Sequence, residues 1–524
     1  MSASPNTATV AEEEWTVLGH PISLFVLFFA EFWERFSFYG MRALLVLYMA
    51  DTVSGLSYSE DYAKSVYGAY GAMVYATPAI GGLLADRLLG YRKAILVGGA
   101  LMALGHFAMA VENPYFFFGA LALLILGNGF FKPNISSLVG KLYSEDDPRR
   151  DGAFTIFYMG INLGAFFAPL ACGAVAVYFG HEGADGGVVR AYHYGFGLAG
   201  IGMVLGLITF MAFQKHLGPH GFPPLDDNGE PPAKALEWAT YVGPFLILPV
   251  VMWLTWETQV AGYLLIVGGA LIFGYLFIWS LTAEPVERNR MWVILILMFF
   301  SMLFWSFFEQ AGSSLTLFAE NNVDRTIGSF TIETSWFQAV NPMFIVLLAP
   351  VFAAVWTNLD KRNLDPSAPT KFGLGVVQLG LGFGLLWWGA THHTAGITPM
   401  TWLILGYLLH TTGELCLSPV GLSMVTKLSN PRMVGMVMGA WFLATAFSHY
   451  LAAMIAKLTG GGGHGGDGHE ATDAAAAMAG YADVFQGITI VALVAGVVCL
   501  AMAPLLSKWM HMDRLGEDAG AGAH

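Results

Sequence analysis

The segment EFWERFSFYG, residues 31–40, lies inside an apolar run that extends over about residues 21–50. This run is long enough for a membrane-spanning helix, which needs about 20 residues. It nevertheless contains three charged side chains, Glu31, Glu34 and Arg35. Each charge costs at least about 2.5–3.5 kcal/mol at the centre of a helix in a bilayer, so such residues normally face a partner or an internal cavity. The segment therefore predicts a membrane protein with a polar interior.

The composition supports a membrane protein. Of 524 residues, 56% are hydrophobic and only 12% are charged, whereas soluble domains carry about 25% charged residues. Residues 1–15 contain no Lys or Arg and no short apolar segment, which argues against a cleaved signal peptide. The three cysteines, Cys172, Cys416 and Cys499, all lie in apolar runs and suggest neither a disulfide framework nor a metal site.

Fourteen apolar runs are long enough to cross a bilayer. They lie at about residues 21–50, 62–85, 93–111, 115–141, 154–180, 194–215, 240–257, 260–282, 290–320, 334–357, 371–391, 399–427, 433–457 and 481–507. The connector at 218–238 is rich in Pro, Gly and acidic residues and is predicted to be a loop between two bundles.

The distribution of Lys and Arg predicts the orientation. With a cytoplasmic N-terminus, seventeen of these residues fall on the cytoplasmic side and four on the outside. This positive-inside bias supports an even number of spans with both termini in the cytoplasm.

The ionisable residues within the predicted spans form a small set. They are Glu31, Glu34, Arg35, Arg42, Lys132, Glu309 and Glu414. At 100° per residue, the four members in the first span lie at about 0°, −60°, 40° and 20° around the helix, which places them on one face. That face is predicted to line a polar cavity, although a structural ion-pair cluster between helices is the alternative.

The balance of charge in this set suggests what the cavity binds. Four acidic and three basic side chains leave a net charge of −1 when all are ionised, which is unfavourable in a low-dielectric interior. One bound proton would make the set neutral, and a zwitterionic guest would add no net charge. The residues thus suggest a proton-coupled carrier of a small zwitterion.

Several motifs in the chain resemble those of a known family. They are EFWERFSFYG (31–40), GGLLADRLLGYRK (81–93), FFKPNISSLVG (130–140), FTIFYMGINLGAF (154–166), WSFFEQAG (305–312), FQAVNP (337–342) and GELCLSPVGLS (413–423). In this order they are similar to the proton-dependent oligopeptide transporter family of the major facilitator superfamily. The segment at 81–93 resembles the superfamily's cytoplasmic loop between the second and third spans. One departure is Phe38, where the family usually has Tyr.

The resemblance implies an all-α membrane protein with two six-helix bundles around a central cavity. The implied organisation is a tail at 1–20, a first bundle at 21–217, a linker with an extra helix pair at 218–287, a second bundle at 288–509 and a tail at 510–524. Such an extra pair is similar to that of prokaryotic members, so a multi-pass protein of a bacterial inner membrane is expected.

The resemblance also implies roles for individual residues. Lys132, Arg35 and Arg42 would bind the peptide carboxylate, since the guanidinium group suits bidentate contacts and Lys acts as a point charge. The remaining implied peptide-binding residues are Glu414 and Asn341 for the amino terminus, Asn162, Tyr75 and Tyr39 for the amide, and Trp305, Trp441 and Ser418 around the side chains. For each Trp, a position facing lipid or the core is the alternative.

Proton coupling is assigned by the same resemblance to Glu31, Glu34 and Arg35, with Glu309 and Arg42. Glu309 and Arg42 lie at the same predicted depth, and their pair would close an outer gate. The family also pairs Lys132 with Glu414 to close the inner gate.

Other features carry less weight. Residues 460–470, GGGGHGGDGHE, contain two His and two acidic residues but are predicted to be a low-complexity loop rather than a metal site. His106, His410 and His449 are interpreted as satisfied polar residues rather than proton relays. The chain lacks HExxH, GxSxG and P-loop motifs, which argues against an enzyme or an ATP-driven pump.

The predicted function is proton-coupled import of di- and tripeptides by a monomer that uses no cofactor and binds no nucleic acid. Two alternatives remain. One is a carrier of another small anion or zwitterion, although retention of Glu31 and Glu34 favours proton symport. The other is a non-transporting sensor, although the longest soluble stretch has only about 20 residues and offers no output domain.

Overall fold

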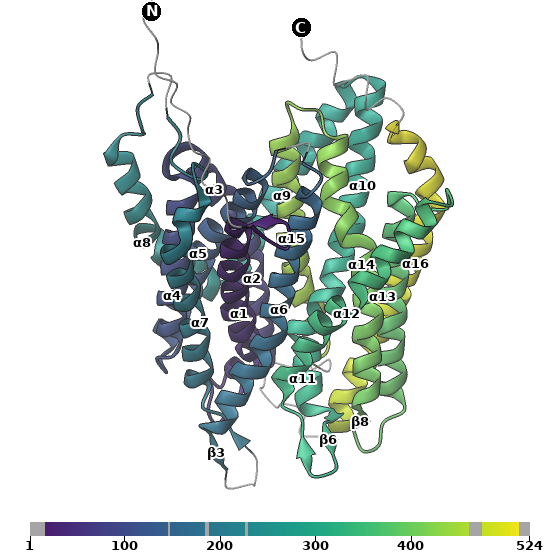
Figure 1. The fold of residues 1–524 in the computed structure, drawn as a ribbon. Coiled ribbons are helices and arrows are strands. Elements are labelled where there is room, and N and C mark those ends of the chain that lie inside the picture. The colour runs from purple at the N-terminus through teal and green to yellow at the C-terminus, as the bar shows by residue number, and fades with distance from the viewer. Residues whose placement is uncertain (1–15, 145–146, 184–187, 226–228, 461–473, 513–524) are drawn as a thin grey trace, which may run out of the picture.

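The computed structural model describes residues 16–144, 147–183, 188–225, 229–460 and 474–512, and within them the chain is almost entirely helical (Figure 1). Eleven helical segments among these residues are long and apolar enough to cross a membrane. The all-α architecture that the resemblance implied is therefore confirmed for the described residues.

The first group of helices packs around its own core. It comprises α1 (Ile22–Ala50), α2 (Glu60–Ala76), α3 (Pro78–Leu84), the π-helix η1 (Ala85–Leu89), α4 (Gly90–Met109), α5 (Pro114–Lys141), α6 (Arg150–Tyr178), α7 (Tyr192–Phe213) and the 3₁₀ turn η2 (Gln214–Leu217). Its buried apolar side chains run from Leu24 to Leu217, and only Leu317 is added from outside this range.

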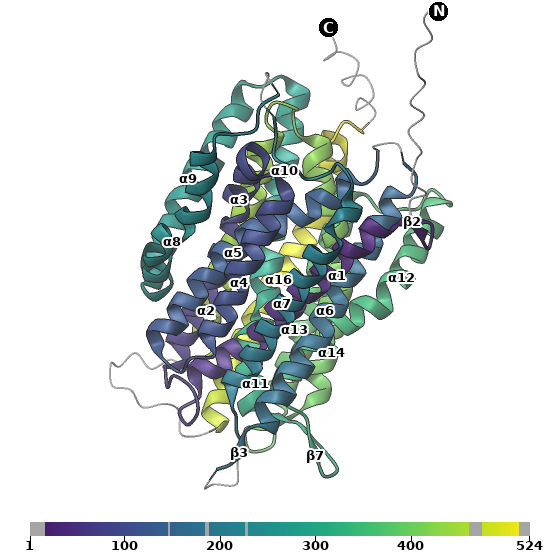
Figure 2. The same cartoon turned by 60° about the vertical axis from the view of Figure 1, so that its left-hand side comes forward.

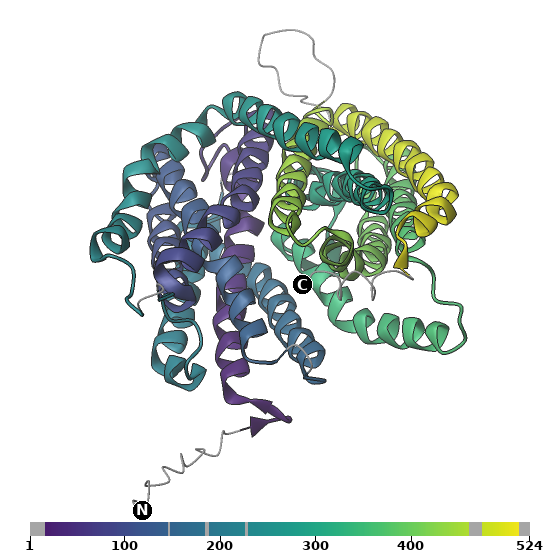
Figure 3. The ribbon, with the colours of Figure 1, turned by 90° about the horizontal axis from the view of Figure 1, so that it is seen from above.

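A second group packs around a separate core that runs from Leu276 to Met510. It comprises α10 (Pro285–Phe308), η3 (Glu309–Gly312), α11 (Ser314–Asn321), η4 (Thr334–Ala339), α12 (Val340–Asp360), α13 (Ala368–Thr391), α14 (Met400–Leu428), α15 (Val434–Lys457) and α16 (Ala474–Trp509). Figure 3 shows the two groups side by side. Two separate cores imply that the groups can move relative to each other more easily than either can deform.

Two further helices join the groups, α8 (Lys234–Trp256) and α9 (Thr258–Thr282). Tyr241 and Leu248 of α8 pack against the first group. Leu265 of α9 packs against Ala72 of α2 and Ala446 of α15, so it touches both groups. Figure 2 shows this helix pair along one side of the molecule.

Short strand pairs mark the two ends of the molecule. The antiparallel pairs are β1 (Thr16–Val17) with β2 (His20–Pro21), β3 (His181–Glu182) with β4 (Val188–Val189), and β6 (Thr326–Ile327) with β7 (Phe330–Thr331). Strands β5 (Val323–Asp324) and β8 (Thr398–Pro399) pair in parallel. We call the end with β3–β4 and β6–β7 the hairpin end; it lies at the bottom of Figure 1.

Each of the fourteen ranges predicted as a span contains a helix. One of the eleven apolar segments, Glu60–Met109, covers two predicted spans. Helix α1 is not among the eleven because Glu31, Glu34, Arg35 and Arg42 interrupt its apolar run.

Two local predictions were wrong. Residues 81–93 are not a loop: α3 continues into η1, and the direction changes at Gly90, whose φ of 70° suits a residue without a side chain. The predicted continuous span 290–320 is broken, because α10 ends at Phe308, and Ser313 has a non-helical backbone with φ −130° and ψ −94°. This break places Glu309 at the end of α10.

Candidate functional site

The charged side chains of α1 form a buried cluster. Glu31, Glu34 and Arg35 are between 0% and 4% exposed. Arg35 Nε lies 3.0 Å from Glu31 Oε1 and also contacts Glu34, and Asn128 of α5 approaches Glu34 Oε1 at 3.5 Å. The helix spacing therefore brings these residues together as predicted.

This cluster is incompletely paired. Glu31 Oε2 and Arg35 Nη2 are buried, and neither has a hydrogen-bond partner among the described residues. The Arg35 guanidinium lies 5.5 Å from the ring centre of Phe38, which supplies a π face but no hydroxyl. Buried polar atoms without partners are rare in folded proteins and need an explanation. A proton on the carboxylate would remove its charge, and a guest that reaches the guanidinium would give Arg35 Nη2 a partner.

Arg42 connects α1 to the second group. Its Nη2 lies 2.6 Å from Glu309 Oε2, and its Nε donates to the Tyr67 hydroxyl at 2.6 Å. The guanidinium also lies 5.6 Å from the ring centre of Tyr39. The predicted Arg42–Glu309 pair is thus present, and it joins the two helix groups toward the hairpin end.

Lys132 of α5 is not paired with a carboxylate in the part of the chain that the structure describes. Its Nζ instead lies 4.1 Å from the ring centre of Tyr75, a cation–π contact. The expected partner, Glu414 of α14, accepts a hydrogen bond at 2.9 Å from Asn341, whose amide also donates to Thr411. The predicted Lys132–Glu414 pair is therefore not formed in this conformation.

The other predicted peptide-binding residues occupy varied surroundings. Asn162 donates to the Tyr158 carbonyl within α6 at 2.9 Å. Trp305 packs edge-on against Phe304 and Phe308, and Trp441 packs closely against Gly421 of α14. Ser418 is half-buried and precedes Pro419.

Sequence reasoning missed several neighbours of the site. Tyr67 and Asn128 bond to members of the charged set, and Thr411 accepts a hydrogen bond from Asn341, the partner of Glu414. Tyr67 lies eight residues before Tyr75 on α2, a spacing that places both on one helix face and gave a signal that was available.

The interpretation of His106, His410 and His449 as satisfied polar residues was wrong, because each has at least one buried ring nitrogen without a partner among the described residues. His449 also lies near Glu309.

A second connection between the groups lies at the hairpin end. Arg190, just before α7, contacts Glu333 at 2.8 Å and Glu320 at 3.0 Å. Burial disfavours the charged form of Arg190, but the two carboxylates outweigh this effect and raise its pKa above the usual range. Arg190 was not among the residues that the sequence pointed to for the site.

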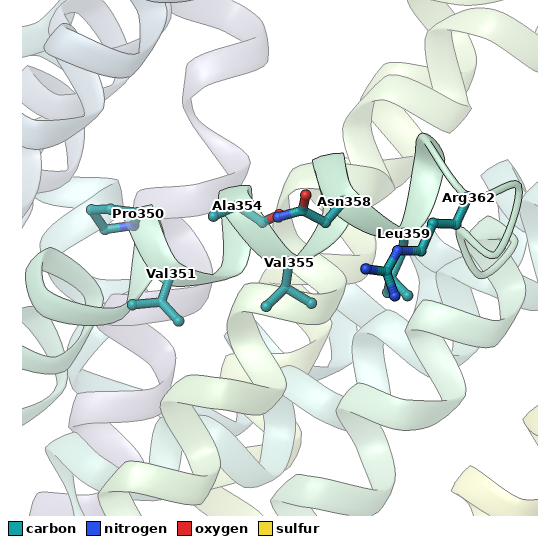
Figure 4. Close-up of a pocket in the computed structure, with 7 residues that line it drawn as sticks. All are labelled: Pro350, Val351, Ala354, Val355, Asn358, Leu359 and Arg362. Atoms are coloured by element: carbon teal, nitrogen blue, oxygen red, sulfur yellow. The ribbon is translucent and has the colours of Figure 1, made fainter.

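A groove along α12 is separate from the charged set. It is lined by Pro350, Val351, Ala354, Val355, Asn358, Leu359 and Arg362, all on one helix or its end (Figure 4). Most of these side chains are apolar and partly exposed, as expected for a helix facing lipid. This groove is not the candidate site.

Metal and disulfide chemistry find no support in the described chain. Within these residues no group of three or more His, Cys, Asp or Glu side chains could hold a metal. Cys172, Cys416 and Cys499 are buried free thiols. Residues 461–470 of the predicted low-complexity loop lie outside the described residues.

A family model described as the POT family matches residues 92–463, most of the chain. The chain belongs to the POT family. Among curated relatives, it is 38% identical to the peptide transporter YePEPT of Yersinia enterocolitica, over 86% of this chain and 89% of that protein. It is 32% identical to the dipeptide and tripeptide permease B of Edwardsiella piscicida, over 96% of this chain and 99% of the permease.

Solved POT structures share the fold over nearly the whole chain. A peptide transporter POT in complex with sulfate is 36% identical, with a TM-score of 0.79, and the match covers 95% of this chain and 97% of that one. A POT family transporter in complex with 5-aminolevulinic acid is 32% identical, with a TM-score of 0.78, and covers 94% and 98% of the two chains.

Proposed function

We propose that this POT-family chain is a proton-coupled symporter that imports di- and tripeptides by alternating access. It is a secondary transporter rather than an enzyme. The names of its relatives support this function, since they include peptide transporters and a dipeptide and tripeptide permease. One solved relative binds 5-aminolevulinic acid, a small molecule with an amino group and a carboxyl group.

The observation that carries the proposal is the state of Lys132 and Glu414. They come from opposite helix groups, both are held largely within the protein, and neither is paired with an opposite charge among the described residues. A peptide zwitterion offers a carboxylate for Lys132 and an ammonium group for Glu414. The guest would thus neutralise two charges that the protein alone leaves uncompensated.

Contacts support two further roles, and the family resemblance supplies the others. Arg35 Nη2 lacks a partner in the part of the chain that the structure describes and would add a second donor for the peptide carboxylate, with Arg42 nearby. Asn341 already orients Glu414 and would share the amino terminus. We assign the peptide amide to Tyr39, Tyr75 and Asn162, and the side-chain pockets to Trp305, Trp441 and Ser418.

Proton coupling would use the carboxylates. Glu31 and Glu34 share one arginine, so the cluster carries an excess negative charge inside the protein when both are ionised. A proton removes that excess, and no other cofactor is needed. Glu309 would take part because its protonation breaks the ion pair with Arg42.

We further propose the major facilitator arrangement with fourteen spans in a bacterial inner membrane. The two helix groups correspond to bundles at 21–217 and 288–509, with the linker and extra helices at 218–287 between them. Both tails, 1–20 and 510–524, would be cytoplasmic, so the hairpin end would face outward. A single chain carries all the proposed binding residues, which supports a functional monomer.

The test is uptake of tritiated alanyl-alanine into proteoliposomes. We expect accumulation above the external concentration only when an inward proton gradient or an inside-negative voltage is applied. Equal uptake with and without the gradient would exclude proton coupling. Absence of any peptide exchange by the folded protein would exclude peptide transport.

A further inference from the structure

His449 lies at a junction between the two helix groups. It sits on α15, is 5% exposed, and faces α2 of the first group. Its Nδ1 atom is 3.7 Å from Glu309 Oε2, the same oxygen that receives Arg42. That atom is buried and has no hydrogen-bond partner within the described residues. The imidazole Nδ1 is therefore close to the Arg42–Glu309 ion pair and forms no hydrogen bond with another described residue.

The ring is held in this place by packing. It stacks on Tyr75, with 4.7 Å between ring centres and 24° between planes. A side chain at Gly71 would come within 2.7 Å of His449 Nδ1, so only glycine allows α2 to approach this closely. Gln310, next to Glu309, donates to the Ala452 carbonyl one turn along α15 at 2.9 Å. These contacts fix the imidazole and the carboxylate relative to each other.

Charged and titratable groups from several elements surround the ring. Besides Glu309 of η3, they are Arg42 of α1, Lys132 of α5, and Tyr67, Tyr70 and Tyr75 of α2. Glu309 is the only carboxylate among them. His449 also borders a small hollow that Arg42, Tyr67 and Tyr70 line. A proton that enters the hollow thus meets one imidazole before one carboxylate.

We propose that His449 passes a proton to Glu309 and thereby opens the Arg42–Glu309 pair. The neutral ring with a hydrogen on Nδ1 takes a proton on Nε2 from a hydronium ion, which leaves a water molecule. The Nδ1–H bond then breaks as the O–H bond forms on Glu309 Oε2, which leaves a neutral ring with its hydrogen on Nε2. One proton enters, one carboxylate becomes neutral, and Arg42 loses its ionic partner.

The observed separation suits such a step. Proton transfer needs about 2.6–3.2 Å between heavy atoms, and resting structures often show longer distances that shorten in use. Closing 3.7 Å to this range requires a shift of about 0.5–1.1 Å. An imidazole can also accept a proton on one ring nitrogen and release one from the other. His449 is thus a positioning and proton-transfer residue that acts through Glu309, and the inference rests on the proposed function.

The test compares His449→Gln with His106→Gln in proteoliposomes. His106 is also fully buried and has no partner on either ring nitrogen, but no carboxylate contacts it among the described residues. Peptide counterflow and proton-driven uptake are measured from pH 5 to 8. We expect His449→Gln to keep peptide binding, to lose at least about tenfold in driven uptake, and to flatten the pH dependence of counterflow. His106→Gln should retain the parental pH profile.

The same substitution in a Glu309→Gln background separates a relay from a packing role. Without the acceptor carboxylate, His449→Gln should cause no further change in the pH profile, since the two residues act as one unit. Additive effects would overturn the proposal, as would a parental pH profile in the single variant. If His449→Gln does not fold, His449→Asn serves instead, because its amide can occupy the place of Nδ1. A parent protein that transports no peptide would reject the proposed function, whereas unchanged coupling in the variants rejects only the relay.

Discussion

The two ends of the boundary between the helix groups differ in how their charges are used. Toward the hairpin end, Arg42 pairs with Glu309, and Arg190 pairs with Glu320 and Glu333. All three pairs join the first group to the second. Lys132 and Glu414 lie farther from the hairpin end and also come from different helix groups. Among the described residues, however, they do not form a pair.

Near the opposite end, two arginines instead make contacts within one helix group or with the linker that follows it. Arg92 of α4 donates to the carbonyls of His220 at 2.7 Å and Gly218 at 2.5 Å. Arg290 of α10 donates to the Met510 carbonyl at 3.2 Å. Figure 1 shows the ribbons of the two groups drawing apart toward this end. This comparison suggests two uses for oppositely charged residues on the two helix groups. Where the groups are in contact, the charges pair and hold that end closed; where the groups are apart, the unpaired charges are available to bind a peptide.

The largest expected effect concerns the unpaired charges. Lys132→Ala or Glu414→Ala should weaken peptide binding by about 2–5 kcal/mol, because one peptide terminus then remains buried without its partner. Binding is measured by calorimetry on the purified, folded protein. Lys141→Ala, an exposed lysine at the end of the same helix, is the matched control. An unchanged dissociation constant in both site variants would show that the peptide binds elsewhere.

The next effect separates binding from coupling. Glu31→Gln or Glu34→Gln should abolish accumulation driven by a proton gradient while peptide counterflow continues, because an amide keeps the shape but cannot carry the proton. Glu182→Gln, on an exposed hairpin, is the control and should accumulate peptide normally. Full accumulation in both cluster variants would assign Glu31 and Glu34 to structure alone.

Glu309→Gln tests the Arg42–Glu309 ion pair directly. The neutral amide imitates a permanently protonated Glu309, so the variant should bind peptide and exchange it but not concentrate it. Counterflow and uptake driven by pH or voltage are measured on one preparation. Driven accumulation at the parental level would make Glu309 an ion-pair partner and no more. Loss of both activities in a folded protein would place it among the residues that hold the peptide.

The smallest expected effect is at Arg190. Arg190→Gln removes one of two connections at the hairpin end while Arg42–Glu309 remains, so we expect uptake to change by no more than about threefold. Arg149→Gln is the control, because Arg149 pairs with Asp147 inside the first group at an exposed site. A complete loss of transport by Arg190→Gln would show that this connection, and not Arg42–Glu309, controls access.

Much of this arrangement could be predicted from the sequence. Hydrophobic runs located the helices, and the 100° spacing on α1 placed Glu31, Glu34 and Arg35 on one face because the helix geometry is local. The Arg42–Glu309 pair followed from equal depth in two predicted spans. The relation of Lys132 to Glu414 did not follow, since it depends on which conformation the two groups adopt.

Other features of the structure were not predicted, in part because some arise from contacts between distant parts of the chain, and the periodicity of hydrophobic residues carries no information on these. The break after Phe308 falls at the polar, Gly-containing stretch EQAGSS (309–314), a local signal that the hydrophobicity of the whole run outweighed. His449 lies far from Glu309 in the chain, and only the packing of α15 against α2 and η3 brings it near. The segment at 81–93 was predicted to be a loop, but it is helical on both sides of Gly90.

The central claim is that the two ends open alternately, and distances across both ends test it most directly. Spin labels at Val188 and Phe330 report on the hairpin end, and labels at Lys141 and Lys427 report on the opposite end; all four residues are exposed and each pair spans the two groups. The account predicts that acid and peptide change the two distances in opposite directions, and that Glu309→Gln shifts both at neutral pH. Distances that do not change, or that rise and fall together, would contradict alternating access governed by the Arg42–Glu309 pair.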